Sequence, residues 1–516
     1  MRNRPMRRNI FTLLTLLLAT TFLVCSCKKN DKGNKDIVLI TDLPLEKRVE
    51  IANRYDDIYD FKDGYATVSL NDKYGCIDIY GNEIIPCKYD YAPEQFKFCD
   101  GLAKVNIKHR TEWGFVNTKG EEVVPCKYAS VRDFSEGLAA VSDIRGNGFI
   151  DKNGKEIVPL VYDEVWDFKD GMACVQKDWK YGFVNNNGAE VCECIYDNAK
   201  DFSEGLARVN YRGYWGFVNK EGEEAIMTTY SDATDFKGGI ALVRIEDLWG
   251  AIDTNGTEII PCKYSDMRQF SEGLAAVKID GKWGYIDMDA NIVIPCKYDE
   301  ACPFQNGFAK VGIGEYTIDA WGMIDKTGKE VIPCEYYNLS DFKDGYTYAT
   351  MYGTRNYMIE NRMGVFDENG NLTVPFKYKR ISEFKNGLAE VSCYLDAKEG
   401  VIDKSGNEII PCKYNDIYIQ DEGIIHVILN GKCGILDYEG KEILPCDEYT
   451  FNDYLYGLTI VEKDGKFGGI TKTGEIAIPI TYDACYFIKP LDLIFCANKT
   501  DDKYGNFTVH SIKPSE

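Results

Sequence analysis

The chain has 516 residues, of which 45% are hydrophobic, 13% aromatic and 28% charged. This composition excludes a disordered chain, a collagen and a polytopic membrane protein. Its 60 Lys and Arg against 82 Asp and Glu give a net charge of −22. Nucleic-acid binding is therefore not expected, because phosphate backbones require a concentrated cationic surface. Domains of about 150 residues would divide this length into three or four, but that estimate fails for a chain built from short repeats.

The N-terminal segment has the pattern of an export signal. Four arginines precede an apolar run, residues 10–24, that is too short to cross a bilayer comfortably. The following Val24-Cys25-Ser26-Cys27 resembles a bacterial lipobox, in which a small residue precedes the cysteine that is lipidated. We predict a lipoprotein signal peptide at residues 1–26, lipidation at Cys27 and a tether at residues 27–52. An uncleaved N-terminal anchor helix is the alternative.

Cleavage of this signal would leave a mature chain of net charge −26, attached to the membrane only through its N-terminal lipid. We therefore expect the protein in the bacterial cell envelope. The sequence leaves open whether it lies on the outer membrane, faces the periplasm or faces the cell surface.

From residue 53 to residue 510 the sequence repeats itself, most often at a spacing of 34 residues. FSEGLA occurs at 134–139, 202–207 and 270–275, and IIPCKY occurs at 84–89, 259–264 and 409–414. An aromatic residue followed by glycine, or glycine alone in degenerate copies, marks twelve repeats. We number repeats 1 to 12 by these anchor glycines: Gly75, Gly114, Gly148, Gly182, Gly216, Gly250, Gly284, Gly322, Gly364, Gly400, Gly434 and Gly468.

Three further positions recur at fixed distances after the anchor glycine. Glycine follows six residues later in eleven repeats, proline eleven residues later in ten, and tyrosine fourteen residues later in eleven. Tyr504-Gly505 begins a truncated thirteenth copy, and residues 511–516 form a C-terminal tail.

Within a repeat the pattern predicts β-structure. In residues 270–304, a strand-like run at 274–279 is followed by the turn Asp280-Gly281-Lys282 and a second strand at 283–287. A third strand stops at the recurrent proline, which has no N–H to donate to a ladder. We predict three strands in each repeat, with the following stretch acting as a connection.

The recurrent pairs resemble the WG-repeat family, and the likeness extends over about residues 53–510. The complete pairs are Trp113-Gly114, Trp215-Gly216, Trp249-Gly250, Trp283-Gly284 and Trp321-Gly322, to which we assign a structural role. The resemblance implies a β-rich repeat array, found widely in bacterial proteins of unassigned biochemical role. It implies no catalytic residues.

The predicted fold is therefore all-β, a tandem array of about twelve three-stranded units of about 34 residues that stabilise one another through neighbour contacts. We expect an elongated superhelical array. A closed, propeller-like ring is the alternative, disfavoured by three strands against the four of a propeller blade.

Eight of the 19 cysteines occupy one repeat position, twelve residues after the anchor glycine: Cys87, Cys126, Cys194, Cys262, Cys296, Cys334, Cys412 and Cys446. At about 4.8 Å per strand, equivalent cysteines would lie about 14 Å apart, beyond the reach of a disulfide. We predict that they are small, buried, apolar side chains.

No known catalytic motif is present. The three histidines, His109, His426 and His510, fall in different repeats, and we expect them on the surface or in turns. Asp287-x-Asp289-x-Asn291 resembles a calcium loop but lacks its glycine, and it aligns with the ordinary turn of other repeats. We predict no enzymatic activity, no metal site and no cofactor.

Three consecutive repeats are lengthened within the same hairpin. The inserted stretches supply the candidate partner-binding residues, an aromatic and arginine mixture typical of interface hot spots: Tyr316, Asp319, Tyr352, Arg355, Tyr357 and Arg362. We predict a surface that binds or scaffolds another envelope protein. The alternatives are a glycan-binding surface and, more distantly, an envelope hydrolase that uses acidic residues.

Overall fold

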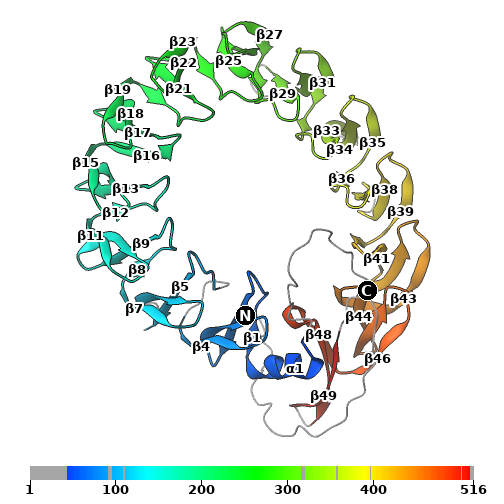
Figure 1. Ribbon diagram of the computed structural model, residues 1–516. Helices are drawn as coiled ribbons and strands as arrows, with labels where there is room; N and C mark the ends of the chain where they lie inside the picture. The colour runs from blue at the N-terminus through cyan, green and yellow to red at the C-terminus, as the bar shows by residue number, and fades with distance from the viewer. Residues whose placement is uncertain are drawn as a thin grey trace, which may run out of the picture. The chain divides into compact units, whose positions relative to one another are not determined.

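The computed structural model describes residues 43–90, 96–107, 111–314, 320–355, 358–394, 397–500 and 503–511. The predicted signal peptide and the lipidation site Cys27 lie outside these residues. None of the helices within them is long and apolar enough to cross a membrane. The chain divides into two compact units (Figure 1): unit 1 combines Met1–Leu160 with Gln420–Glu516, and unit 2 is Val161–Ile419.

The single α-helix of the described chain, α1 (Leu45–Arg54), belongs to unit 1. Arg48 and Ile51 are buried on it, and Leu45 and Val49 pack against the same cluster, so one helical face is turned inward. The predicted tether, residues 27–52, therefore differs from the structure at its end. Residues 45–52 are helical because this face is covered by the sheets of unit 1.

Strands account for almost all the rest of unit 1. They are β1 (Asp57–Ile58), β2 (Tyr65–Leu70), β3 (Lys73–Asp78), β4 (Glu83–Tyr89), β5 (Leu102–Ile107), β6 (Glu112–Asn117), β7 (Glu122–Tyr128), β8 (Ser130–Val131), β9 (Leu138–Asp143), β10 (Gly146–Asp151), β11 (Glu156–Tyr162, in which the boundary with unit 2 falls), β41 (Ile424–Leu429), β42 (Lys432–Asp437), β43 (Glu442–Leu455), β44 (Leu458–Lys463), β45 (Lys466–Thr471), β46 (Ile476–Tyr482), β47 (Ala484–Ile488), the 3₁₀ turn η2 (Lys489–Leu491), β48 (Leu493–Thr500) and β49 (Lys503–Ser511).

Unit 2 is built only of strands in its described residues. They are β12 (Glu164–Val165), β13 (Met172–Lys177), β14 (Lys180–Asn185), β15 (Glu190–Tyr196), β16 (Asn198–Ser203), β17 (Leu206–Tyr211), β18 (Tyr214–Asn219), β19 (Glu224–Tyr230), β20 (Asp232–Ala233), β21 (Ile240–Ile245), β22 (Leu248–Asp253), β23 (Glu258–Tyr264), β24 (Asp266–Met267), β25 (Ala275–Ile279), β26 (Lys282–Ile286), β27 (Ile292–Tyr298), β28 (Glu300–Ala301), β29 (Phe308–Ile313), β30 (Ala320–Asp325), β31 (Glu330–Tyr336), β32 (Asn338–Leu339), β33 (Tyr346–Arg355), β34 (Met358–Asp367), β35 (Leu372–Tyr378), β36 (Arg380–Ile381), β37 (Leu388–Ser392), β38 (Glu399–Asp403), β39 (Glu408–Tyr414) and β40 (Asp416–Ile419).

The predicted all-β repeat array is confirmed, with one more strand in most repeats than the sequence predicts. A typical repeat is an antiparallel meander of four strands, as in the order β12-β13-β14-β15. The additional first strand is often only two residues long and lies in the stretch predicted to be a connection. Two residues are too few to produce a periodic pattern. The strand count therefore no longer argues against a propeller-like arrangement.

The anchor glycine of every repeat lies where the last strand crosses the third. In all twelve repeats, a Cβ on this glycine would stand 2.3 to 2.9 Å from the carbonyl oxygen ten residues later. The pairing is irregular at the same place: Trp249 pairs with Tyr264, whereas Ala251 pairs with Ile260. Since Cβ atoms do not approach a carbonyl oxygen this closely, glycine is required for the two backbones to meet.

Adjacent repeats share their hydrophobic cores. One cluster in unit 2 combines Phe217 and Ile226 of one repeat with Phe236 and Val243 of the next. The rings of Phe217 and Phe236 lie 4.8 Å apart between centroids, and the equivalent pair Phe183–Phe202 of the preceding interface lies 5.0 Å apart. No repeat buries these rings by itself, so neighbour contacts stabilise the array.

The recurrent cysteines are half-buried rather than fully buried, and one of them is paired. Seven are free thiols, and each Sγ lies within 3.5 to 4.0 Å of a valine carbonyl oxygen, as in Cys126 with Val105. The eighth, Cys412, forms a disulfide with Cys393, which does not occupy the recurrent position. The prediction that these cysteines are buried and unpaired is therefore wrong for Cys412.

We expect Gly250→Ala to lower the free energy of unfolding of unit 2 by about 3 kcal/mol, because the new methyl group must push two strands apart. Gly239→Ala is the matched control. Gly239 has a φ of +77°, and a Cβ added there would meet no atom within 4 Å, so only a conformational penalty of about 1 kcal/mol applies. Urea unfolding followed by tryptophan fluorescence measures both variants. Equal losses would contradict the close-approach explanation.

Most free thiols should react slowly with an alkylating reagent in the native protein at neutral pH. Burial raises the pKa of Cys76, Cys87 and Cys126 to about 12, so very little reactive thiolate is present. Mass spectrometry of native and urea-denatured protein counts the labelled cysteines. Fast labelling of most thiols in the native state would contradict this expectation.

Candidate functional site

The ends of the central hairpins in unit 2 carry a row of exposed, large apolar side chains. Six belong to the end of the second strand, the start of the third or the turn between them, and two lie in the equivalent part of a longer second strand, β33. We call this set the hairpin-end row: Trp179, Tyr211, Tyr214, Ile245, Leu248, Ile313, Met351 and Tyr352. Because equivalent hairpins belong to sheets that pack face to face through shared cores, these ends follow one another along the same edge of the array.

The strands of the longest hairpin of this row contain three of the predicted partner-binding residues, and the side chains of two of them are described. Strands β33 and β34 have ten residues each, against five or six in the equivalent strands of neighbouring repeats. Tyr352 is 49% exposed, and its ring lies 4.1 Å from that of Tyr337. Arg362 lies with its guanidinium 5.8 Å from the ring centre of Tyr394.

The hairpin separates these two predicted residues. Tyr352 pairs with Asn361, whereas Arg362 pairs with Met351. Since neighbouring residues of a strand point to opposite faces, Tyr352 and Arg362 lie on opposite faces of the ribbon. Of the other candidates, Tyr316, Asp319 and Tyr357 lie outside the described residues, and only the backbone of Arg355, at the end of β33, is described.

Four of the five tryptophans of the recurrent Trp-Gly pairs are poor candidates for ligand stacking. Trp215, Trp249 and Trp321 are half-buried, and Trp283 is buried. A cation lies over each of these four rings, 4.7 to 5.5 Å from its centre: Arg208 over Trp215, Arg244 over Trp249, Lys310 over Trp321 and Arg268 over Trp283. These contacts cover ring faces that a sugar would otherwise use.

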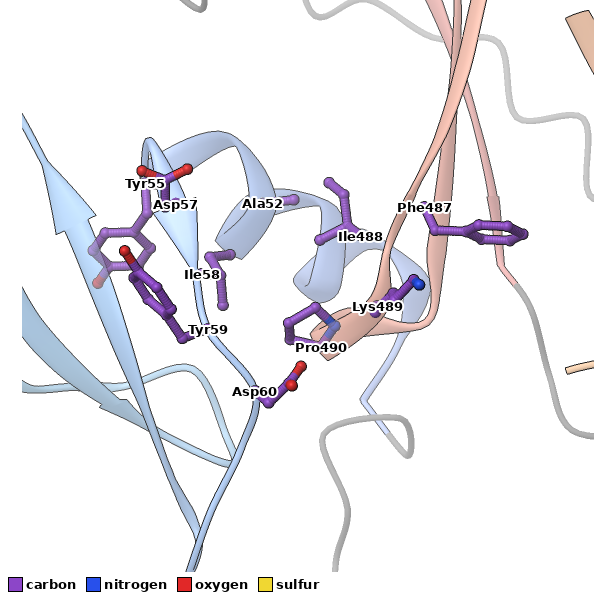
Figure 2. Close-up of a pocket in the computed structure, with 10 residues that line it drawn as sticks. All are labelled: Ala52, Tyr55, Asp57, Ile58, Tyr59, Asp60, Phe487, Ile488, Lys489 and Pro490. Carbon is purple, nitrogen blue, oxygen red and sulfur yellow. The ribbon is translucent and has the colours of Figure 1, made fainter. Parts of the chain in front are cut away.

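A pocket of about 350 Å³ lies in unit 1 between the α1–β1 segment and the β47–η2 segment (Figure 2). Figure 2 shows the rings of Tyr55 and Tyr59 on the α1–β1 side, with Pro490 facing them. Burial raises the pKa of Tyr55 to about 12, and its hydroxyl donates to Glu83 Oε2 at 3.4 Å. The carboxylate of Asp57, which also lines the pocket, accepts a hydrogen bond from Ser69 Oγ at 3.0 Å.

The wall of this pocket is fixed by a buried arginine. Arg48 is 2% exposed, and its Nη1 donates to the carbonyl oxygens of Leu491 at 2.9 Å and Asp492 at 3.4 Å. Burial raises the pKa of the Asp492 carboxyl to about 6, and the nearby Arg48 opposes that rise. These contacts join α1 to the connection between β47 and β48.

One histidine is buried, contrary to the prediction that all three lie on the surface or in turns. His426 is 1% exposed in β41, and its Nε2 lies 2.9 Å from Thr459 Oγ1. Burial lowers the pKa of His426 to about 4, so the ring is neutral at pH 7. His109 lies outside the described residues, and His510 lies half-buried in β49.

The acidic turn that resembles a calcium loop is an Asx turn, in agreement with its alignment to the ordinary turn of other repeats. Asp287 Oδ1 accepts the backbone N–H groups of Asp289 at 3.0 Å and Asn291 at 2.8 Å. Across the described part of the chain, no group of three or more His, Cys, Asp or Glu side chains is placed to hold a metal ion.

The family model of the WG containing repeat matches eleven successive segments, which together cover more than half of the chain: residues 50–74, 74–108, 113–143, 148–181, 181–215, 215–249, 249–283, 283–316, 321–353, 363–393 and 400–433. The chain belongs to this family of WG-containing repeat proteins. The WG repeats continue in the structure beyond the last matched segment, since β44, β45 and β46 have the same pairing and the same close approach at Gly468.

Several solved structures are also similar to the chain. A eukaryotic initiation factor is 13% identical, with 60% of this chain and 96% of that chain covered and a TM-score of 0.28. The extracellular domain of the putative one component system BT4673 from B. thetaiotaomicron is 9% identical, with 89% and 76% covered and a TM-score of 0.19. Kluyveromyces lactis Hsv2 is 10% identical, with 59% and 95% covered and a TM-score of 0.18. Because these TM-scores are low, we infer no function of this chain from the similar structures. No curated protein matches it.

His426→Gln should reduce the pH dependence of the stability of unit 1. The unfolded chain takes up a proton at His426 near pH 6.5, whereas the folded chain does so only near pH 4. The wild type should therefore lose up to about 3 kcal/mol of unfolding free energy as the pH falls through this window, and the variant should not. Asp492 and the other carboxyls are common to both proteins, so the difference between the two urea-unfolding curves isolates His426. Parallel curves from pH 7 to pH 4 would contradict the assignment.

Proposed function

We propose that this protein is a non-catalytic scaffold whose WG-repeat array binds another protein of the bacterial cell envelope. The observation that carries this proposal is the hairpin-end row of unit 2. Its eight large apolar side chains are between 37% and 83% exposed and lie on five of the six hairpins from β13–β14 to β33–β34. Exposed apolar residues are common when they are scattered, but a run along one edge is typical of an interaction surface.

The composition of the row supports a protein partner. It includes one tryptophan and three tyrosines, and Arg212 lies beside them with its guanidinium 5.1 Å from the ring centre of Tyr211. Trp, Tyr and Arg are the residues that most often dominate the free energy of protein–protein binding. The lipid expected at Cys27 would hold the array at a membrane, where partners are concentrated on a surface.

A glycan-binding function is the second candidate, and the pocket of Figure 2 favours it. Its volume of about 350 Å³ lies within the range of small-molecule sites. It combines the half-buried ring of Tyr59 with the exposed carboxylates of Asp57 and Asp60. Aromatic rings and carboxylates together provide a stacking surface and hydrogen-bond acceptors for hydroxyl groups.

Site-specific photo-crosslinking in the source cells tests the protein-binding proposal. A photoreactive side chain replaces Ile245, which is 48% exposed in the hairpin-end row, or Met288, which is 46% exposed in the Asp287 turn. We expect irradiation to join position 245 to a discrete protein species, with no equivalent product at position 288.

Identical products at both positions would contradict a defined binding edge. The absence of any protein product at position 245, in cells that display the full chain, would contradict the scaffold proposal. Because both positions belong to unit 2 and are equally accessible, differences in expression or exposure do not explain a difference between them.

A further inference from the structure

Repeats 4 and 5 depart from the repeat pattern in several ways at once. Five of their apolar side chains are strongly exposed, and we call them the repeat-4/5 patch: Trp179 at 83%, Ile195 at 46%, Tyr211 at 37%, Tyr214 at 53% and Met227 at 68%. Trp179 lies in a turn, Ile195 replaces a lysine of other repeats and Met227 replaces their proline. Tyr211 and Tyr214 lie at a hairpin end.

Trp179 is held in an unfavourable backbone conformation while its side chain remains in solvent. It follows Asp178 in the β13–β14 turn, where the two residues have φ values of +51° and +64°. Four other repeats place glycine at the position of Trp179, as in Gly213 and Gly281. A bulky residue at positive φ is strained, and an 83% exposed side chain gains little packing in return. Folding alone gives no reason for tryptophan here.

The last strands of the same two repeats lack the proline found in the other ten. Glu193 and Met227 replace it. Both β15 and β19 are edge strands in the order of their sheets. Proline removes a backbone N–H and discourages an edge from pairing with another chain, so repeats 4 and 5 have lost this protection.

Ile195 makes the same edge apolar. It precedes the recurrent tyrosine, where six repeats have a lysine whose ammonium group lies 4.9 to 5.3 Å from the centre of the tyrosine ring. In repeat 4 that lysine is absent, and Ile195 is exposed next to Tyr196.

The ring of Tyr196 connects the two hairpin ends of the patch. Tyr196 pairs with Tyr181 at the base of the β13–β14 turn, and its ring lies 6.3 Å from that of Tyr211 at the β17–β18 end. Trp179, Ile195 and Tyr211 therefore lie at the same end of two sheets that pack face to face.

Two exposed cations, Lys177 and Arg212, flank the patch outside the ion pairs of the described structure, although the Asp197 carboxylate attracts Arg212 electrostatically. Lys180 is held by Asp197, which also accepts the backbone N–H of Arg212. The side chains of Lys177 and Arg212 form no ion pair, and both are exposed. On a chain of net charge −22, two unpaired cations beside exposed aromatic rings favour an acidic partner, although Asp178 lies on the same turn.

We propose that repeats 4 and 5 form the main contact for an extended segment of another protein, one that carries apolar side chains next to carboxylates. The segment packs on Trp179 and Tyr211 and pairs with the unprotected edge of β15 or β19, while Lys177 and Arg212 meet its acidic groups. This inference rests on the proposed scaffold function and names its binding site.

Selection of a random peptide library displayed on phage against the purified full chain tests the site. We expect enriched peptides that combine apolar and acidic residues. Trp179→Gly should weaken their binding about 30-fold or more, while raising the urea midpoint of the chain because glycine accepts the positive φ. Met288→Ser, in the exposed Asp287 turn outside the hairpin-end row, should leave binding unchanged.

The double variant Glu193→Pro, Met227→Pro tests both candidate strand edges separately from Trp179. Ten repeats fold with proline at the equivalent position, so the variant should keep its circular dichroism spectrum and lose about tenfold in peptide affinity.

Three results would overturn the inference: no enriched peptide, equal binding by the wild type and Trp179→Gly, or Trp179-dependent sedimentation with phosphatidylglycerol vesicles instead of peptide binding. A protein crosslink at position 245 that does not depend on Trp179 would overturn this site and leave the scaffold function in place.

Discussion

The close approach of two backbones at the anchor glycine is the constraint on which each repeat depends. The carbonyl oxygen of the last strand stands within 2.9 Å of where a Cβ would be in all twelve repeats. This contact lets the last strand fold tightly over the third, and it places the preceding aromatic residue opposite the recurrent tyrosine, as in Trp249 with Tyr264. The glycine of the Trp-Gly pair is therefore a geometric requirement of the strand crossing.

From this crossing the contacts between repeats follow. The residue after the anchor glycine, such as Phe217, meets a phenylalanine of the next repeat, and the recurrent tyrosine can reach the next repeat's glutamate, as Tyr162 reaches Glu190 at 3.2 Å. The aromatic contact recurs at other interfaces, as in Phe115 with Phe134 and Phe183 with Phe202. The stability of one repeat therefore depends on its neighbours, and a disturbance at one crossing weakens two interfaces.

The sequence was sufficient to predict the parts of the fold that recur. Periodicity identified the repeats, their β-structure and the turn at Asp287, because each of these features recurs in many repeats. It did not reveal β12 and its equivalents, since two-residue strands have no period. Helix α1 and the buried His426 each occur once, so their burial depends on partners elsewhere in the chain, such as Leu491 and Thr459. The disulfide of Cys412 depends on Cys393, which no spacing rule singles out.

Departures from the pattern offer the better guide to function, because the pattern itself is explained by folding. Trp179, Glu193, Ile195 and Met227 depart from the repeat rules in two adjacent repeats, and none of them improves packing.

The most direct test is a full chain in which these four positions receive the repeat residues Gly, Pro, Lys and Pro, measured for urea stability and peptide binding together. The account predicts unchanged or greater stability with loss of binding. Retained binding, or a chain that no longer folds, would contradict it.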